Sequence, residues 1–364
     1  GLLAFRLSKN VTVSMVIAAA APFIGFYTHV FNHPNYFSLT YLPLGILQWI
    51  RFTESLKSFD LKLKNILINF ILLVVVMWLI INSSQTKEAV ISFAFIFGWG
   101  LLYMVLCLSS RYKIINVISI TTIVLMTIIL FVSPYVIIFL SSLFESATSY
   151  DGKVPTDPYP TSLIFGFFEP LVFQEWTSNH PLKMQKLVGL SSNILFLFLL
   201  IWAINTKLKG NHIFQSTIVF FLISFSIAYG LMPDIIIQSI PLVNRIGHNV
   251  INFGIPLVMF TIILSTYGAM NLNKKDLTLY CIKFWMIFTL LTILVISHFY
   301  IDDNIIHTLS FLAFLSIGLY IIKKLTSDLA YKNKTVELLT ITFLTFMTLK
   351  NGMHLQYGKT FDNY

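Results

Sequence analysis

Residues 66–81 read ILINFILLVVVMWLII, and residues 89–108, which follow after a short polar break, read AVISFAFIFGWGLLYMVLCL. Each run is apolar along its whole length and comes close to the roughly 20 residues that an α-helix needs to cross a bilayer. Transmembrane β-strands would instead appear as segments of about ten residues with alternating polarity. This stretch therefore predicts two consecutive membrane-spanning helices.

The composition of the whole chain agrees with this prediction. The chain has 364 residues, of which 57% are hydrophobic and 11% are charged, and its mean hydropathy is +0.81. A soluble domain usually carries about 25% charged residues. A chain this apolar has too few polar side chains to cover its surface in water. We therefore expect it to lie in the hydrocarbon of a membrane.

Apolar runs of similar length recur along the sequence. They predict an all-α, polytopic transmembrane protein of about eleven spans that forms a single helical domain over residues 1–364. The run at 37–50 is short and contains Pro43, which suggests a tilted or broken helix, whereas the run at 114–144 contains Pro134 and is long enough to kink and leave the membrane. The predicted spans are 11–31, 37–50, 66–81, 89–108, 114–144, 187–205, 214–231, 250–270, 277–297, 305–322 and 336–349.

Basic residues gather in alternate loops between these spans. One set of loops holds about 16 lysines and arginines and the other about 6, and basic loops face the cytoplasm. We therefore expect residue 1 on the cytoplasmic side and residue 364 on the other side. The net charge of +9 is explained by this topology, so no nucleic-acid partner is expected. The basic set comprises Arg6, Lys9, Arg51, Lys57, Lys62, Lys64, Arg111, Lys113, Lys207, Lys209, Lys274, Lys275, Lys323, Lys324, Lys332 and Lys334.

The sequence contains no P-loop, GxGxxG, HExxH or GxSxG motif. Its two cysteines, Cys107 and Cys281, both lie in apolar runs, so neither a disulfide nor a metal site is predicted. Candidate functional residues are instead polar side chains on the predicted outer face. They are His29 and His33 in the first outer turn, and Arg245 and His248 before the span at 250–270.

Each of these outer residues has a structural alternative. A histidine at such a position can simply cap a helix or face water, and an arginine there can anchor the helix in the headgroup region. The functional interpretation of Arg245 is that its paired N–H donors bind a lipid phosphate.

The longest predicted outer loop covers residues 145–186 and includes VPTDPYPTSLIFGFFEPLVFQEW. It contains four candidate acids, Asp151, Asp157, Glu169 and Glu175. Its phenylalanines and Trp176 suit an extracytoplasmic loop that lies partly in the headgroup region. A substrate-facing loop is the alternative, and the sequence leaves both open.

Three stretches carry a resemblance to a known family. GLLAFRLSKNVTVSMVIAAAAPFIGFYTHVFNHPNYFSLTYLPLGILQWIRF, KLVGLSSNILFLFLLIWAI and IPLVNRIGHNVINFGIPLVMFTIILSTYGAMNL resemble, in this order, helices of YfhO-like bacterial membrane proteins of the GT-C glycosyltransferase superfamily. The resemblance covers most of the chain and implies residence in the bacterial inner (plasma) membrane. This sequence departs from the family pattern at Asn249, where a second arginine is usual.

The resemblance implies transfer of a sugar from a polyprenyl-phosphate carrier to an envelope acceptor outside the cytoplasm. Membrane lipid and the lipid-linked sugar would then be partners, and Arg245 with His248 would bind the lipid phosphate. In this superfamily the catalytic carboxylate usually lies in the first outer loop. We expect that loop and the helix before it to precede Gly1, and the sequence does not specify whether a divalent metal takes part.

Two alternatives to a transferase are a lipid or solute transporter and a non-catalytic membrane subunit with protein partners. A transporter would predict an internal repeat and helices broken at the membrane midplane. A non-catalytic subunit would explain the scarcity of outer acids and would predict extensive buried contacts with partners.

Overall fold

A computed structural model describes residues 1–21, 38–57, 63–83, 86–109, 112–145, 194–205, 211–239 and 249–270. The described part is helical and contains no strand, which confirms the all-α prediction there. The chain divides into two compact units. Among the described helices, unit 1 contains α1 (Leu2–Ser8), α2 (Val11–Ala20), α10 (Ile194–Asn205) and the part of α13 (Asn249–Met270) from Thr261 onward. Unit 2 contains α4 (Ser38–Lys57), α5 (Leu63–Asn82), α6 (Thr86–Leu108), α7 (Ile114–Glu145), α11 (His212–Ala228), α12 (Asp234–Ser239) and the part of α13 up to Phe260.

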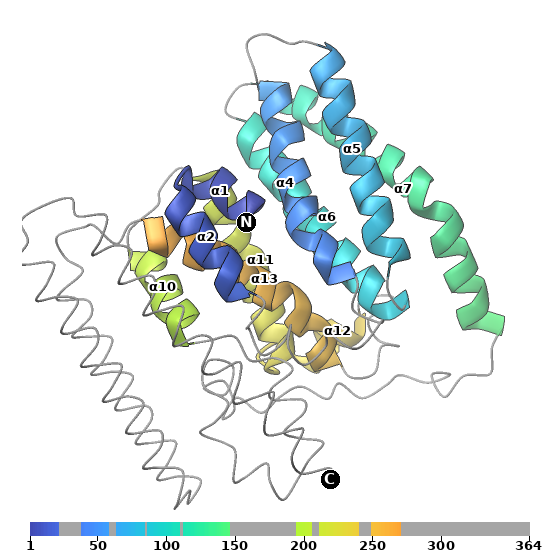
Figure 1. The fold of residues 1–364 in the computed structure, drawn as a ribbon. Helices are drawn as coiled ribbons and strands as arrows, with labels where there is room; N and C mark the ends of the chain where they lie inside the picture. Colours follow the sequence, from blue (N-terminus) through green and yellow to red (C-terminus); the bar gives the residue numbers. More distant parts are fainter. Residues whose placement is uncertain are drawn as a thin grey trace, which may run out of the picture. The chain divides into compact units, whose positions relative to one another are not determined.

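Helices α4 to α7 of unit 2 run alternately up and down, so that α4 and α6 are parallel and lie next to each other (Figure 1). Glycines allow this close approach. A Cβ atom at Gly45 would lie 3.0 Å from side-chain atoms of both Ile80 and Ile96. A Cβ at Gly100 would collide with the indole of Trp49, which is completely buried. In the α4–α6 contact, large side chains of one helix therefore pack on glycines of the other.

Four of the described helices are long and apolar enough to span a membrane. The candidate spans are Leu63–Asn82, Glu88–Leu108, Ile114–Ile138 and Asn252–Met270, and α11 is apolar but shorter. This finding indicates an integral membrane protein. The predicted spans at 277–297, 305–322 and 336–349 lie outside the described residues.

Two proline-containing helices can be compared with the sequence prediction, and α4 differs from it in part. Helix α4 is continuous from Ser38 to Lys57 although it contains Pro43, so the alternative of a broken helix is wrong there. Helix α7 likewise continues through Pro134 for 32 residues. Neighbouring helices and side chains in membrane proteins can satisfy the backbone groups that a proline leaves unpaired. At about 1.5 Å per residue, α7 is longer than the roughly 30 Å hydrocarbon layer, as its sequence predicts.

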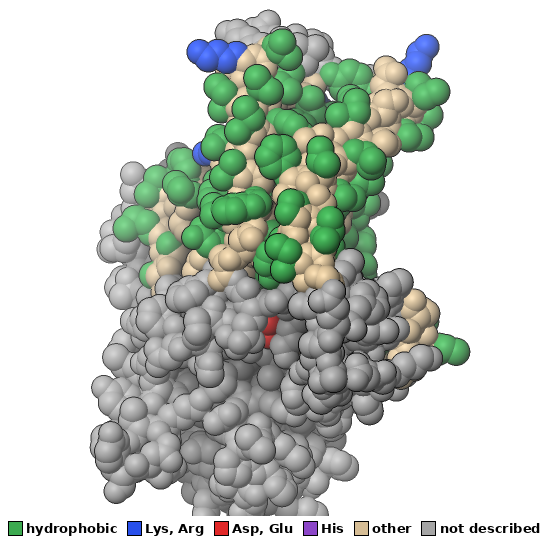
Figure 2. Space-filling model, turned by 90° about the vertical axis from the view of Figure 1, so that its right-hand side faces the viewer, with side chains coloured by type: hydrophobic (Ala, Val, Ile, Leu, Met, Phe, Trp, Pro, Cys, Tyr) green, Lys and Arg blue, Asp and Glu red, His purple; other side chains and the backbone are tan. Residues whose placement is uncertain are grey.

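The outer faces of α5 and α7 are apolar. Trp78 on α5 is 45% exposed and Leu130 on α7 is 70% exposed. Figure 2 shows hydrophobic side chains covering this face, with lysine or arginine side chains at its upper end. In water such a surface would be unfavourable, whereas it is compatible with contact with membrane lipid.

Helices α6, α11 and the first half of α13 pack through aromatic rings. Phe95 of α6 contacts Phe220 of α11, Phe253 and Phe260 of α13, at centroid distances of 6.0, 5.6 and 6.4 Å. Nearby, Nε1 of Trp99 donates a 3.1 Å hydrogen bond to Oγ1 of Thr217. These contacts fix the position of α6 inside unit 2.

Unit 1 is also held together by a helix cap and by a hydrogen bond between helices. Lys9 ends α1 in the left-handed region, with φ of 53°, and the Asn10 side chain then caps α2 by accepting hydrogen bonds from the Thr12 and Val13 amides. Farther along the chain, Ser265 Oγ of α13 donates a 2.8 Å hydrogen bond to the carbonyl of Phe196 in α10. Such polar contacts and close approaches are typical of helix packing in membranes.

Candidate functional site

The residues singled out by sequence lie outside the described part of the chain. They are Arg245, His248, His29, His33, Asp151, Asp157, Glu169 and Glu175, and the 145–186 loop lies outside it beyond Glu145. The described residues nevertheless include the helices that flank several of these positions in the sequence. Helix α13 begins at Asn249, directly after His248. The candidate site is therefore built from the helix ends of unit 2.

One end of unit 2 is basic. Lys57 ends α4, Lys64 lies in the first turn of α5 and Lys113 immediately precedes α7, and all three side chains are exposed. The Tyr112 hydroxyl donates a 2.8 Å hydrogen bond to the carbonyl of Leu56, which holds these two turns together. The described helix ends that flank two of the loops predicted to be cytoplasmic thus lie at the same end of unit 2.

The opposite end holds a buried acid. Glu88 lies in the first turn of α6 and only 3% of its surface is exposed. With a rise of about 1.5 Å per residue, the length of α6 puts Glu88 roughly 30 Å from the basic end. The candidate membrane span of α6 begins at this residue. A carboxylate at a helix N-terminus is stabilised by the helix dipole, but an acid with only that role is normally exposed.

One turn farther along α6, Ser92 is completely buried, and within the described structure its hydroxyl has no hydrogen-bond partner. Serines in helices normally donate to a carbonyl one turn back, as Ser119 does to Ile115 and Ser133 does to Leu130. Leaving a buried hydroxyl unpaired costs about 1–3 kcal/mol. Ser92 therefore presents a polar group that a ligand could satisfy.

Glu88 and Ser92 share one face of α6. Residues four apart on a helix have Cβ atoms about 5–6 Å from each other, and side chains tilt toward the helix N-terminus. The Ser92 Cβ atom thus leans toward the turn that carries Glu88. Phe95 and Trp99 continue the same face, so the two polar residues extend the face that packs on α11.

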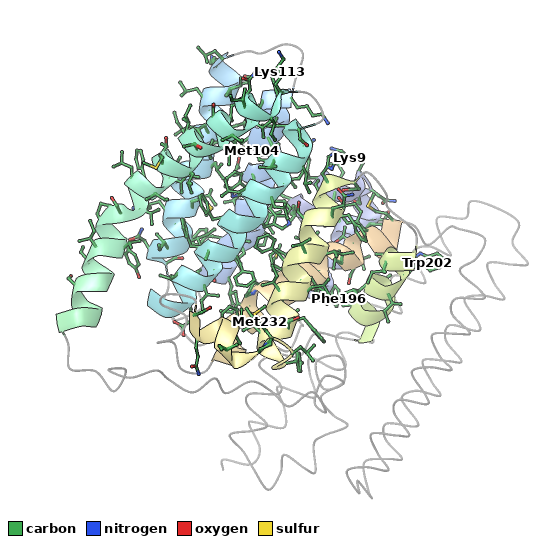
Figure 3. The ribbon with its side chains drawn as sticks, turned by 180° about the vertical axis from the view of Figure 1, so that it is seen from behind. Lys9, Met104, Lys113, Phe196, Trp202 and Met232 are labelled. Carbon is green, nitrogen blue, oxygen red and sulfur yellow. The ribbon has the colours of Figure 1, made fainter. Side chains whose placement is uncertain are left out.

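Helix α11 runs antiparallel to α6. Figure 3 shows Lys113 at one end of unit 2, Met104 nearer to it, and Met232, just after α11, at the other end. The pairing of Trp99 with Thr217 and of Phe95 with Phe220 gives the register. Continued along both helices, this register predicts that the end of α11 lies beside the turn that holds Glu88 and Ser92.

A tight turn closes α11 at this end. Gly230 has a φ of 63°, and the amides of Leu231 and Met232 both donate to the carbonyl of Ser226. The left-handed conformation suits glycine, which carries no Cβ. The first half of α13 contributes Asn252, which is 2% exposed and adjoins Phe253, the partner of Phe95.

Other buried hydroxyls lie deeper in unit 2. Within the described part of the chain, Thr53 Oγ1 and Ser216 Oγ also have no hydrogen-bond partner. Ser216 precedes Thr217, which pairs with Trp99 near the middle of α6, so Ser216 lies away from the Glu88 turn. It therefore provides a useful comparison for Ser92.

No cluster of three or more histidine, cysteine, aspartate or glutamate side chains that could hold a metal ion occurs among the described residues. The chemistry that the Glu88 turn can offer is that of one carboxylate and one hydroxyl. These groups suit the recognition of a hydroxylated ligand, because a carboxylate accepts hydrogen bonds and a hydroxyl both donates and accepts them.

Sequence reasoning missed Glu88. The residue adjoins Lys87 in a polar break between two apolar runs, where an acid is normally read as solvated. The available signal was the spacing of Glu88, Ser92, Phe95 and Trp99, which places all four on one helical face that otherwise packs inward. A charge within such a face is a reason to suspect function.

Comparison of this chain with known protein families, with curated proteins and with solved structures finds no match. The family resemblance of the three sequence stretches therefore stays a prediction. The candidate site rests on the buried polar residues of unit 2 and on the sequence that adjoins them.

Proposed function

We propose that this protein is a membrane glycosyltransferase of the GT-C kind, similar to YfhO-like proteins, which moves a sugar from a polyprenyl-phosphate carrier to an envelope acceptor outside the cytoplasm. The observation that carries the proposal is the difference in charge between the two ends of unit 2. Its helices are apolar, exposed lysines lie at one end, and the buried carboxylate of Glu88 lies at the other.

This difference in charge gives the proposed orientation in the bacterial inner membrane. Basic loops face the cytoplasm, so the end with Lys57, Lys64 and Lys113 is placed inside. The Glu88 end then faces outward, where lipid-linked sugars are used by enzymes of this superfamily. The N-terminus of the chain is accordingly placed inside and the C-terminus outside.

The donor phosphate is assigned to Arg245 and His248. These residues directly precede α13, whose first half packs on α6 through Phe253 and Phe95. A guanidinium binds phosphate through paired N–H donors and stabilises the negative charge that develops on the leaving group. Asn249, which replaces the second arginine of the family pattern, leaves Arg245 as the main source of positive charge in this element.

The remaining outer residues are proposed to serve the sugar or the acceptor. Asp151, Asp157, Glu169 and Glu175 supply carboxylates from the loop at 145–186, and His29 and His33 supply imidazoles from the first outer turn. Polar groups of these types fix the orientation of a sugar through hydrogen bonds to its hydroxyls.

The transporter alternative finds less support. Transporters commonly bind their substrates where helices are broken near the membrane midplane. Helices α4, α7 and α13 each contain a proline, yet each is continuous over its described range. Among the described helices, this observation favours the transferase.

The proposal is tested with the full-length protein in vesicles of phosphatidylethanolamine and phosphatidylglycerol. Polyprenyl phosphates that carry radiolabelled glucose, galactose, mannose or N-acetylglucosamine are added as donors, with an envelope extract as acceptor. We expect one donor to lose its sugar to the extract and to release polyprenyl phosphate. Turnover of none of the donors would reject the proposal.

Substitution of arginines provides the internal control. Arg245→Ala should lower turnover by about 100-fold or more, because one donor to a developing negative charge is commonly worth that much. Arg51→Ala removes an exposed arginine from the basic half of α4 and should leave turnover unchanged. Equal losses in both variants would contradict the assignment of the donor phosphate to Arg245.

A further inference from the structure

We propose that Glu88 and Ser92 bind the hydroxyl group of the acceptor, with Glu88 as the base that removes its proton and Ser92 as the residue that positions it. This inference rests on the proposed function and names the acceptor side of the same site. It replaces the expectation that the catalytic acid must precede Gly1. Both residues lie in the first two turns of α6, within unit 2.

The first observation is the Ser92 hydroxyl. It is fully buried and, in the described part of the protein, it makes no hydrogen bond, not even the bond to a carbonyl one turn back that Ser119 and Ser133 make. A hydroxyl that only filled space would be replaced at no cost by alanine. Among the described residues, Ser216 and Thr53 are unpaired as well, but Ser92 differs from them because it lies one turn from a buried carboxylate, where the oxygen of a ligand would accept its proton.

The second observation is the burial of Glu88, which is 3% exposed at the start of a candidate membrane span. Burial of a carboxylate is costly, so ionisable groups at such positions usually serve a function. Since Ser92 lies one turn away on the same face of α6, one ligand hydroxyl can contact both residues.

The surroundings suit a base. The Glu88 face continues into Phe95 and Trp99, whose rings pack against α11. A carboxylate accepts protons and hydrogen bonds, whereas the exposed lysines at the other end of unit 2 only donate them. This turn is therefore the end of unit 2 that offers a proton acceptor.

The proposed step balances as follows. The acceptor O–H bond breaks and its proton moves to a Glu88 carboxylate oxygen. The acceptor oxygen forms a bond to the anomeric carbon of the sugar, and the bond from that carbon to the phosphate oxygen breaks. The electron pair leaves with polyprenyl phosphate, whose charge Arg245 and His248 are proposed to stabilise. Proton transfer to solvent then restores the carboxylate.

The test compares four variants of the full-length protein in the vesicle assay. Glu88→Gln should lower kcat by about 100- to 10,000-fold while the KM for the donor stays unchanged, because general-base catalysis contributes on that scale. Ser92→Ala should raise the half-saturating amount of acceptor roughly fivefold to tenfold, the loss expected for one hydrogen bond. The matched controls are Ser216→Ala and Glu54→Gln, the latter in the last turns of α4 near the basic end, and both should behave as the wild type.

Stability measurements separate this role from a structural one. Ser92→Ala removes an unpaired buried hydroxyl, so its unfolding midpoint should equal or exceed that of the wild type. A Glu88→Gln protein that turns over normally, or a Ser92→Ala protein with unchanged acceptor saturation, would overturn the inference and leave the proposed function standing. A wild-type protein that uses no donor would reject the proposed function, and the inference with it.

Discussion

The indole Nε1 of Trp99 in α6 donates a 3.1 Å hydrogen bond to Oγ1 of Thr217 in α11, with both groups buried. Thr217 also donates to the carbonyl of Ile213 within its own helix. The threonine hydroxyl thus accepts a hydrogen bond from α6 and donates its own proton to a carbonyl of α11. Because α6 carries the Glu88 turn, this hydrogen bond helps to hold the candidate site in place.

Thr217→Val should weaken this junction. Valine keeps the shape of threonine but leaves the Trp99 N–H unpaired, so we expect a loss of about 1 kcal/mol, the usual size of a hydrogen bond between membrane helices. Unfolding in mixed micelles, followed by tryptophan fluorescence, measures the change. The neighbouring Ser216→Ala should be neutral or slightly stabilising, and a larger loss there than in Thr217→Val would contradict the hydrogen-bond account.

Gly100→Ala should destabilise the α4–α6 contact. The added Cβ would collide with the indole of Trp49, which is fully buried and cannot move aside easily. Overpacking of this kind costs about 1–3 kcal/mol. The same unfolding measurement applies, and the double variant that also carries Trp49→Leu should recover part of the loss.

Gly98→Ala is the matched control for the Gly100 substitution. Its Cβ would meet only the tip of the Phe220 ring, 2.8 Å away at the far end of that side chain, whereas at Gly100 it would meet the fused rings of Trp49 at a shorter distance. We therefore expect a smaller loss than in Gly100→Ala. If both alanine variants were equally unstable, backbone or membrane effects rather than the Trp49 contact would explain the result.

Exposure to lipid can be measured with tryptophan fluorescence. Trp78 on α5 is 45% exposed, whereas Trp49 and Trp99 are completely buried. In single-tryptophan variants reconstituted into brominated lipid, Trp78 should be quenched strongly and the other two weakly, because bromine quenches by contact. Strong quenching of Trp49 would mean that α4 faces lipid instead of packing between α5 and α6.

Sequence predicted the helices of unit 2 because their apolar runs are continuous. The runs at 66–81 and 89–108 correspond to α5 and α6, with the structure adding a few residues at the ends. For α4 the apolar pattern stopped at Ile50, yet the helix continues through Arg51 to Lys57. A helix needs backbone hydrogen bonds rather than apolar side chains, so it can extend past the hydrocarbon into the polar region.

The site was harder to predict for a physical reason. Polar residues were sought in loops, because a charge inside an apolar run is costly and a charge beside one is normally solvated. Glu88 stands at this boundary, and only the packing of α6 on α11 shows that it turns inward. The unpaired state of the Ser92 hydroxyl depends on its rotamer and neighbours, neither of which one sequence specifies.

The central claim is that the Glu88 end of unit 2 faces outward, and side-specific labelling tests it most directly. Cysteines are introduced at Ser83, which follows α5, and at Lys113, which precedes α7, after Cys107 and Cys281 are replaced by alanine. A membrane-impermeant maleimide should label position 83 in intact cells, and position 113 only after the membrane is opened. The reverse pattern would place Glu88 on the cytoplasmic side and contradict the account.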